Sequence, residues 1–310
     1  MIRKPATKNS LSFSVSSVLS VSSVVVAFQL SPVASARAAD PAPWRVFVTI
    51  LPLAGFVERV GGARVDVSVL VGPGQSPHGY EPTPRRIAEL EGARIYFAVG
   101  LPLEETLLAK VRAARRDLAV VDLREGVPLL PMAEVDPDES AARGGARTDP
   151  HVWMDPRRVK TMAWTIARAL SALDPANAAE YERNAAAFRA ELDALDQRIA
   201  RALAPARGKE LLVFHPAFGY FADAYGLRQV AIQTGGREPG ARRLAELIGE
   251  ARRRGVRVVF VQPQFSRKTA RAVAQETGAA VVPFDDLARD YVANLDAMAE
   301  EVRKALEGTK

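Results

Sequence analysis

Residues 175–204 read PANAAEYERNAAAFRAELDALDQRIARALA, and this stretch decides how the rest of the chain is arranged. Asp174 can cap a helix and Pro175 suits its first turn. At about 1.5 Å per residue, a helix of roughly 30 residues reaches about 45 Å, long enough to cross a pair of domains. We therefore expect a rigid helix over 175–204, whose apolar residues recur every three or four positions along one stripe: Tyr181, Ala185, Phe188, Leu192, Leu195, Ile199 and Leu203.

Short β-rich runs alternate with helical patterns on both sides of this helix, which is typical of parallel sheets covered by helices. The fold class is therefore α/β, with two doubly wound parallel-sheet lobes at 40–174 and 205–310, joined by one long rigid helix that limits hinge motion. In the first lobe we expect strands at 45–50, 65–71, 94–99 and 118–123, with helices at 86–91, 103–114 and 156–173. In the second we expect strands at 210–214, 228–233, 257–262 and 279–284, with helices at 220–225, 241–254, 266–276 and 294–306.

The first 39 residues have the layout of a cleavable secretory signal. A basic start is followed by an apolar, serine-rich run over about 11–30 and then by small residues around Ala36 and Ala38. The run is barely long enough to span a bilayer, and its serines favour a cleaved signal over a permanent anchor. The chain has no cysteine for lipid attachment. We expect cleavage near 36–39 and an exported, periplasmic protein.

The composition excludes thiolate chemistry and argues against nucleic-acid binding. Without cysteine there are neither disulfides nor thiolate ligands, so any metal must be held by nitrogen and oxygen atoms. The first 39 residues contain four of the 42 bases and none of the 36 acids, so the remaining chain has 38 bases against 36 acids. A net charge this small does not indicate a nucleic-acid partner.

The chain has only three histidines, His78, His151 and His215, and each lies in a proline-containing loop that follows an expected strand or precedes an expected helix. Ligands of doubly wound sheets bind outside the carboxyl ends of the strands, so loops from two lobes can converge on one cleft. The prolines stiffen these loops and lower the entropy cost of ordering a ligand. The shared placement favours a metal site over three unrelated loop histidines.

An anionic fourth ligand is available where the last expected strand, 279–284, ends at Asp285 and Asp286. Either carboxylate can serve, and the pair can instead cap a helix. Four protein ligands close a tetrahedral zinc shell, whereas a hydrolytic zinc keeps an open position for water. A nitrogen-rich site of this kind favours zinc over manganese, which prefers more oxygen ligands.

Four segments, taken together and in order, carry a resemblance to a known family: HGYEPTP from His78, DPHVWMDP from Asp149, HPAFGYF from His215 and DDLA from Asp285. They resemble the zinc and manganese substrate-binding proteins of ABC importers (cluster A-I), whose two lobes are joined by one long helix. The resemblance covers nearly all of the chain after residue 39. It implies a periplasmic, non-enzymatic, monomeric binding protein that delivers Zn²⁺, or alternatively Mn²⁺, to an importer permease and ATPase.

The same resemblance implies that the metal ligands are His78, His151, His215 and Asp285. A histidine at the third place is similar to the zinc-type members. The chain departs from many of them at 131–148, where a histidine-rich loop is replaced by an acidic stretch without histidine. Manganese or iron as the metal, and Asp286 or water as the fourth ligand, therefore stay open.

Two other functions use the same residues. One is a metal-dependent adhesin or chaperone, which would keep the ligands but have a different partner. The other is a zinc hydrolase with Asp285 as a ligand and Glu81 as the general base. Glu81 is otherwise expected to cap a helix or to orient a histidine, and Trp153 and Phe218 are expected to pack beside the ligands.

Overall fold

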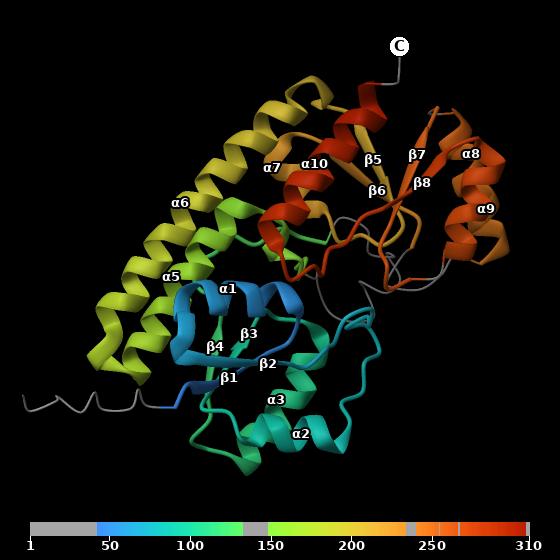
Figure 1. The fold of residues 1–310 in the computed structure, drawn as a ribbon. Coiled ribbons are helices and arrows are strands. Elements are labelled where there is room, and N and C mark those ends of the chain that lie inside the picture. The colour runs from blue at the N-terminus through green and yellow to red at the C-terminus, as the bar shows by residue number, and fades with distance from the viewer. Residues whose placement is uncertain (1–41, 133–147, 234–239, 254, 266, 308–310) are drawn as a thin grey trace, which may run out of the picture. The chain divides into compact units, whose positions relative to one another are not determined.

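The structure, a computed structural model, describes residues 42–132, 148–233, 240–253, 255–265 and 267–307 (Figure 1). The expected signal at 1–39 and most of the loop at 131–149 lie outside these residues. Within the described part, no helix is both long enough and apolar enough to cross a membrane.

The N-terminal lobe is built on a four-stranded parallel sheet in the order β2-β1-β3-β4. Strand β3 has the sequence IYFA and is buried along its whole length, as expected for a parallel strand covered on both faces. The strands are β1 (Trp44–Val48), β2 (Val65–Val69), β3 (Ile95–Ala98) and β4 (Ala119–Asp122). The helices of this lobe are α1 (Leu51–Gly61), α2 (Pro84–Glu91) and α3 (Pro102–Ala114).

The C-terminal lobe repeats this arrangement with a parallel sheet in the order β6-β5-β7-β8. Its strands are β5 (Glu210–Val213), β6 (Arg228–Ala231), β7 (Val258–Val261) and β8 (Ala280–Pro283). In both sheets the first strand in sequence lies between the second and the third, so the predicted pair of doubly wound lobes is confirmed. The helices of this lobe are α7 (Gly219–Tyr225), α8 (Ala241–Arg253), α9 (Arg267–Thr277) and α10 (Tyr291–Glu307).

The long connecting helix is α6 (Ala178–Leu203), and it lies beside α5 (Pro156–Leu173) in Figure 1. Its buried residues are the seven of the apolar stripe read from the sequence. Both ends tighten into 3₁₀ turns, Pro175–Asn177 and Ala204–Ala206, instead of continuing as α-helix.

The start of this helix differs from the sequence prediction in one detail. Asp174 does not cap a backbone amide through its side chain. Its Oδ2 instead accepts hydrogen bonds from the side chains of Asn177 and Tyr181, each at 2.8 Å. The carboxylate therefore fixes the turn between α5 and α6 through side chains, a role that the Asp-Pro sequence does not reveal.

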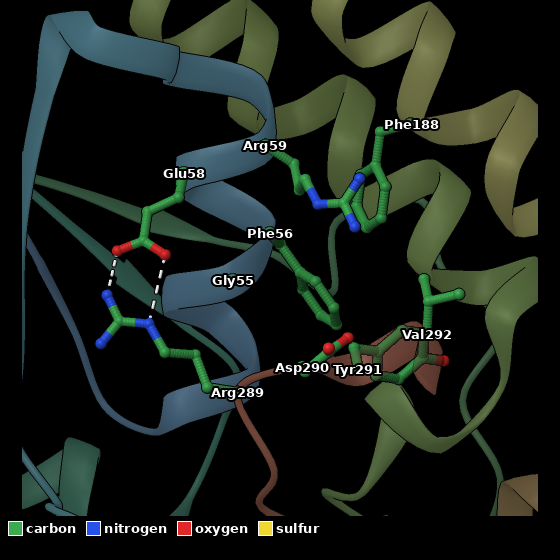
Figure 2. A pocket seen from close by; sticks show the side chains of 9 residues that line it. All are labelled: Gly55, Phe56, Glu58, Arg59, Phe188, Arg289, Asp290, Tyr291 and Val292. Carbon is green, nitrogen blue, oxygen red and sulfur yellow. Dashed lines mark hydrogen bonds and ion pairs between the residues drawn. The ribbon is translucent and has the colours of Figure 1, made fainter. Parts of the chain in front are cut away.

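Helix α1 is the element that the sequence pattern does not predict, and it joins the lobes. A Cβ on Gly55 would lie 2.6 Å from the carbonyl oxygen of Arg289, so glycine is needed for α1 to approach the segment before α10. The Arg289 guanidinium forms an ion pair with Glu58 (Figure 2).

An aromatic cluster lies beside this contact. The Phe56 ring meets Tyr291 edge-on, with 4.9 Å between the ring centroids, and its centroid lies 5.7 Å from that of Phe188 of α6. One apolar core therefore runs through α1, α6 and α10.

Candidate metal centre

His78 lies in the segment between β2 and α2, and it is partly buried. Its backbone N–H donates to Ser76 Oγ at 3.2 Å, which closes a short local turn. Pro77 beside it is buried. The His78 loop therefore presents one half-buried imidazole from the N-terminal lobe.

His151 stands directly before the 3₁₀ turn Val152–Met154 and is 1% exposed. Asp149 Oδ1 accepts from the backbone N–H of His151 at 2.9 Å and lies 2.7 Å from its Nδ1. Because an ionised carboxylate only accepts hydrogen bonds, this contact places the proton on Nδ1. The lone pair on Nε2 is then available for a metal.

His215 follows β5 and is 2% exposed. The side chain of Gln262 holds its backbone from both sides: Nε2 donates to the His215 carbonyl at 3.0 Å, and Oε1 accepts from its N–H at 3.3 Å. The ring is oriented by Gln233, whose Oε1 lies 3.0 Å from Nδ1. An oxygen acceptor at Nδ1 again leaves Nε2 unprotonated.

The three imidazoles converge on one point, although they come from loops far apart in the sequence. Each of His78, His151 and His215 offers one nitrogen, and the three atoms lie within 4.8 Å of one another. The Nε2 atoms of His78 and His215 are 3.0 Å apart. Ligand nitrogens on a tetrahedral zinc are separated by about 3.3 Å, given Zn–N bonds of about 2.0–2.1 Å. The His78–His215 separation is therefore close to that of two ligands on a single ion, and the His151 nitrogen lies within 4.8 Å of both.

Burial and the two neighbouring histidines favour the neutral form of His215. The pKa of His215 is lowered well below its ordinary value, first by burial and then by the neighbouring His151 and His78. The hydrogen bond that His215 Nδ1 donates to Gln233 Oε1 acts in the opposite direction and raises this pKa. A neutral imidazole is the form that binds a metal, so the apolar surroundings of His215 favour the binding form.

The two candidate carboxylates at the end of β8 differ in their surroundings. Asp285 is partly buried, and its Oδ1 accepts from Gln264 Nε2 at 2.8 Å and from the Leu287 N–H at 2.9 Å. Asp286 is 6% exposed, and its Oδ1 has no hydrogen-bond partner. Burial raises the pKa of Asp286 to about 7, while nearby His151 acts to lower it. Neither carboxylate belongs to the group of histidine nitrogens within 4.8 Å.

Of the two residues expected to pack beside the ligands, Trp153 does so, whereas the Phe218 ring packs 4.6 Å from that of Phe284. Trp153 and Phe218 are fully buried. The Trp153 ring lies 5.3 Å from that of His151, and its Nε1 donates to the carbonyl of Asp286 at 2.7 Å. This hydrogen bond ties the His151 segment to the aspartate pair.

Glu81 does not have the role that the sequence suggested. It is exposed, and the oxygens that orient the buried histidines belong to Asp149 and Gln233. The cap of α2 is Thr83, whose side chain accepts from the Arg86 N–H. Asp149 could have been found from its position two residues before His151. Gln233 could not, because only the pairing of β5 with β6 brings it near His215.

A cavity of about 470 Å³ lies elsewhere, between α1, α6 and the start of α10, and Figure 2 shows its lining. None of its lining residues is a histidine. Among the described residues, the group of side chains placed to hold a metal ion is the histidine cluster, which lies outside this cavity.

Comparison with known proteins assigns the chain to a family. The sequence profile of the family described as zinc-uptake complex component A, periplasmic (ZnuA), matches residues 46–305. The chain belongs to this family. It is 30% identical to the high-affinity zinc uptake system protein ZnuA of Bacillus subtilis over 240 residues, covering 76% of this chain and 75% of that protein.

Two further relatives extend this comparison. The zinc-binding lipoprotein AdcA of Streptococcus pneumoniae (strain TIGR4) is 30% identical over 269 residues, covering 84% of this chain. The chain spans about half the length of AdcA, 52%. A crystal structure of a ZnuA deletion mutant with zinc bound has a TM-score of 0.78 and 39% identity, covering 85% of this chain and 98% of that one. The fold is thus the ZnuA fold.

Proposed function

We propose that this chain captures zinc in the periplasm and delivers it to an ABC importer. The observation that carries the proposal is the convergence of one nitrogen each from His78, His151 and His215 within 4.8 Å. Family membership supports it, because ZnuA-family proteins are non-enzymatic components of zinc uptake. The ion is the cargo of the protein and undergoes no chemical change.

Zinc is favoured over manganese by the donor set. Three imidazole nitrogens suit a tetrahedral zinc site, whereas manganese prefers oxygen ligands and a higher coordination number. For the same ligands, zinc also binds more tightly than manganese in the Irving–Williams order. The zinc-bound crystal structure of the ZnuA relative is consistent with this choice.

Asp285 is the proposed fourth ligand. Its Oδ1 is fixed by Gln264 and by the Leu287 amide, and ligating carboxylates are commonly held in this way through hydrogen bonds to surrounding groups. The other oxygen would then bind the ion. Asp286 is the alternative, since it is buried and has one oxygen without a partner.

The hydrolase alternative is not favoured. A zinc hydrolase needs an open coordination position and a base close to it. Glu81, the base that this alternative requires, is an exposed residue. Four protein ligands would also leave no position for an activated water.

The proposed partners and location follow from the family. ZnuA-family proteins serve ABC zinc importers, so a permease and its ATPase are the partners, and we place the docking surface across both lobes. We propose that residues 1–39 are a signal cleaved near 36–39, that no lipid is attached, and that the mature protein is monomeric. Its functional parts would be 40–174, the connecting helix 175–204, and 205–310.

The test is zinc titration of metal-free protein against a competing chelator, with native mass spectrometry for stoichiometry. The expected result is one tightly bound zinc per chain, and weaker binding of manganese. A stoichiometry other than one, or turnover of ester or peptide substrates by the zinc-loaded protein, would refute the proposal.

A further inference from the structure

Asp149 contacts both lobes at once. Its Oδ1 orients His151 through the two contacts described above. Its Oδ2 lies against the first residue of α7, Gly219, where a Cβ would be only 2.6 Å away. Gly219 does not have a positive φ, so its backbone does not require glycine. What requires glycine at this position is the close approach of the carboxylate.

Tyr220, the next residue of α7, forms a hydrogen bond with the backbone of Asp149. Its hydroxyl donates to the Asp149 carbonyl at 2.9 Å and accepts from the Leu130 N–H at 3.0 Å. Leu130 and Asp149 are themselves joined, because the Asp149 N–H donates to the Leu130 carbonyl at 2.9 Å. The buried hydroxyl of Tyr220 therefore binds the backbones of both Leu130 and Asp149.

The ring of Tyr220 is also held by a contact on its face. The Arg158 guanidinium lies over it, 4.6 Å from the ring centroid, which is the geometry of a cation–π contact. The Nε of Arg158 donates to the Pro128 carbonyl at 3.0 Å. Tyr220 thus has little freedom to leave Asp149, because its ring and its hydroxyl are both held.

Helix α7 begins only four residues after His215. One short segment therefore contains the candidate ligand His215 and also contacts Asp149, the carboxylate that orients His151. We propose that Gly219 and Tyr220 are positioning residues for metal binding: they hold Asp149 so that it directs Nε2 of His151 at the ion. This inference rests on the proposed function. Groups that orient a ligating histidine commonly change metal affinity by about 10–100-fold when they are lost.

Gly219→Ala is the decisive variant. Alanine suits a helix better than glycine, so the backbone should accept it, while its Cβ displaces the Asp149 carboxylate. We expect the zinc Kd to rise by about 10-fold or more. Gly249→Ala, a glycine-to-alanine change inside α8, is the matched control and should leave the Kd unchanged. Tyr220→Phe removes only the hydroxyl and should weaken zinc binding by a smaller factor.

Two readouts separate positioning from a general loss of structure. In a double-mutant cycle, Gly219→Ala should weaken binding in the wild type but cause no further loss in an Asp149→Ala background. In metal-free protein, ¹⁵N NMR should find the proton of His151 on Nδ1, and Gly219→Ala should convert this into a mixture of tautomers. The inference is overturned if the single variant keeps both the wild-type Kd and tautomer, or if its loss is equal in the two backgrounds.

The outcomes also separate this inference from the proposed function. If wild-type protein binds no zinc, or if His151→Ala binds zinc as tightly as wild type, the proposed function fails and this inference fails with it. If wild type and His151→Ala behave as proposed but the cycle is additive, only the positioning role is refuted.

Discussion

The Nε2 atoms of His78 and His215 lie 3.0 Å apart, one from each lobe, although 137 positions separate the two residues in the sequence. Both atoms therefore face the same point, and a zinc ion at that point would be held by both lobes. Without an ion, one of the two nitrogens must carry a proton and donate a hydrogen bond to the other, since two lone pairs at this distance repel.

Replacement of either histidine should weaken zinc binding severely. His215→Ala and His78→Ala each remove one of three nitrogen donors, and we expect the zinc Kd to rise at least about 100-fold, since loss of a ligand should exceed the 10–100-fold loss seen for supporting residues. Glu81→Ala is the control from an exposed position on the His78 loop and should bind zinc as wild type does. Chelator competition measures all three. An unchanged Kd for His215→Ala would remove it from the ligand set.

The pH dependence of binding should reflect the lowered pKa of His215. Protons compete with zinc only when the imidazole is protonated, and an ordinary histidine becomes protonated below about 6.5. Because burial and two neighbouring histidines lower the pKa of His215, it stays neutral at more acidic pH than an ordinary histidine. Zinc binding should therefore lose the contribution of His215 only well below pH 6.5. NMR titration of the metal-free protein checks this, and a His215 titration at or above 6.5 would contradict it.

The aspartate pair can be resolved by two matched variants. Asp285→Asn should raise the zinc Kd by about 10–100-fold, as expected when a hydrogen-bonded carboxylate ligand is lost. Asp286→Asn should leave the Kd within a few-fold of wild type. Zinc K-edge absorption spectroscopy of both variants would report the total number of nitrogen and oxygen ligands, and the loss of one ligand is expected for Asp285→Asn only. The reverse result would make Asp286 the ligand.

Much of this fold follows from patterns that are local in the sequence. The stripe from Tyr181 to Leu203 predicts the connecting helix because helical periodicity needs no tertiary information. Helix α1 is different, because most of its residues are buried and so it shows no clear polar face. Gly55 further weakens its helical pattern, and the reason for that glycine, the approach of Arg289, exists only in the folded protein.

The site could be predicted only in part for a related reason. The three histidines are identified by their rarity and by their placement in loops beside strands or helices. The groups that orient them depend on tertiary contacts: Gln233 reaches His215 through strand pairing, and Gln262 reaches it from the position just after β7. The choice between Asp285 and Asp286 turns on which way two adjacent side chains point, and the sequence carries no signal for that.

Phe56 should be the main determinant of stability where the lobes meet. Phe56→Ala removes a fully buried ring that contacts both α6 and α10, and losses of about 3–5 kcal/mol are typical of such changes. Arg289→Ala removes an ion pair from the same contact, but exposed pairs contribute little, so the loss should be much smaller. Urea denaturation of the two variants tests this order. Equal destabilisation would mean that the ion pair contributes as much to this contact as the apolar core does.

The same core should limit domain movement on zinc binding. Helix α1 of the N-terminal lobe, α6 and the start of α10 share one apolar cluster, and opening the lobes would separate Phe56 from Tyr291. We therefore expect zinc release to proceed by movement of ligand loops, with nearly the same angle between the lobes in metal-free and zinc-loaded protein. Crystal structures of both states, with small-angle X-ray scattering in solution, measure this angle. A wide opening on zinc removal would contradict the expectation, and Phe56→Ala is the variant in which such an opening should first become detectable.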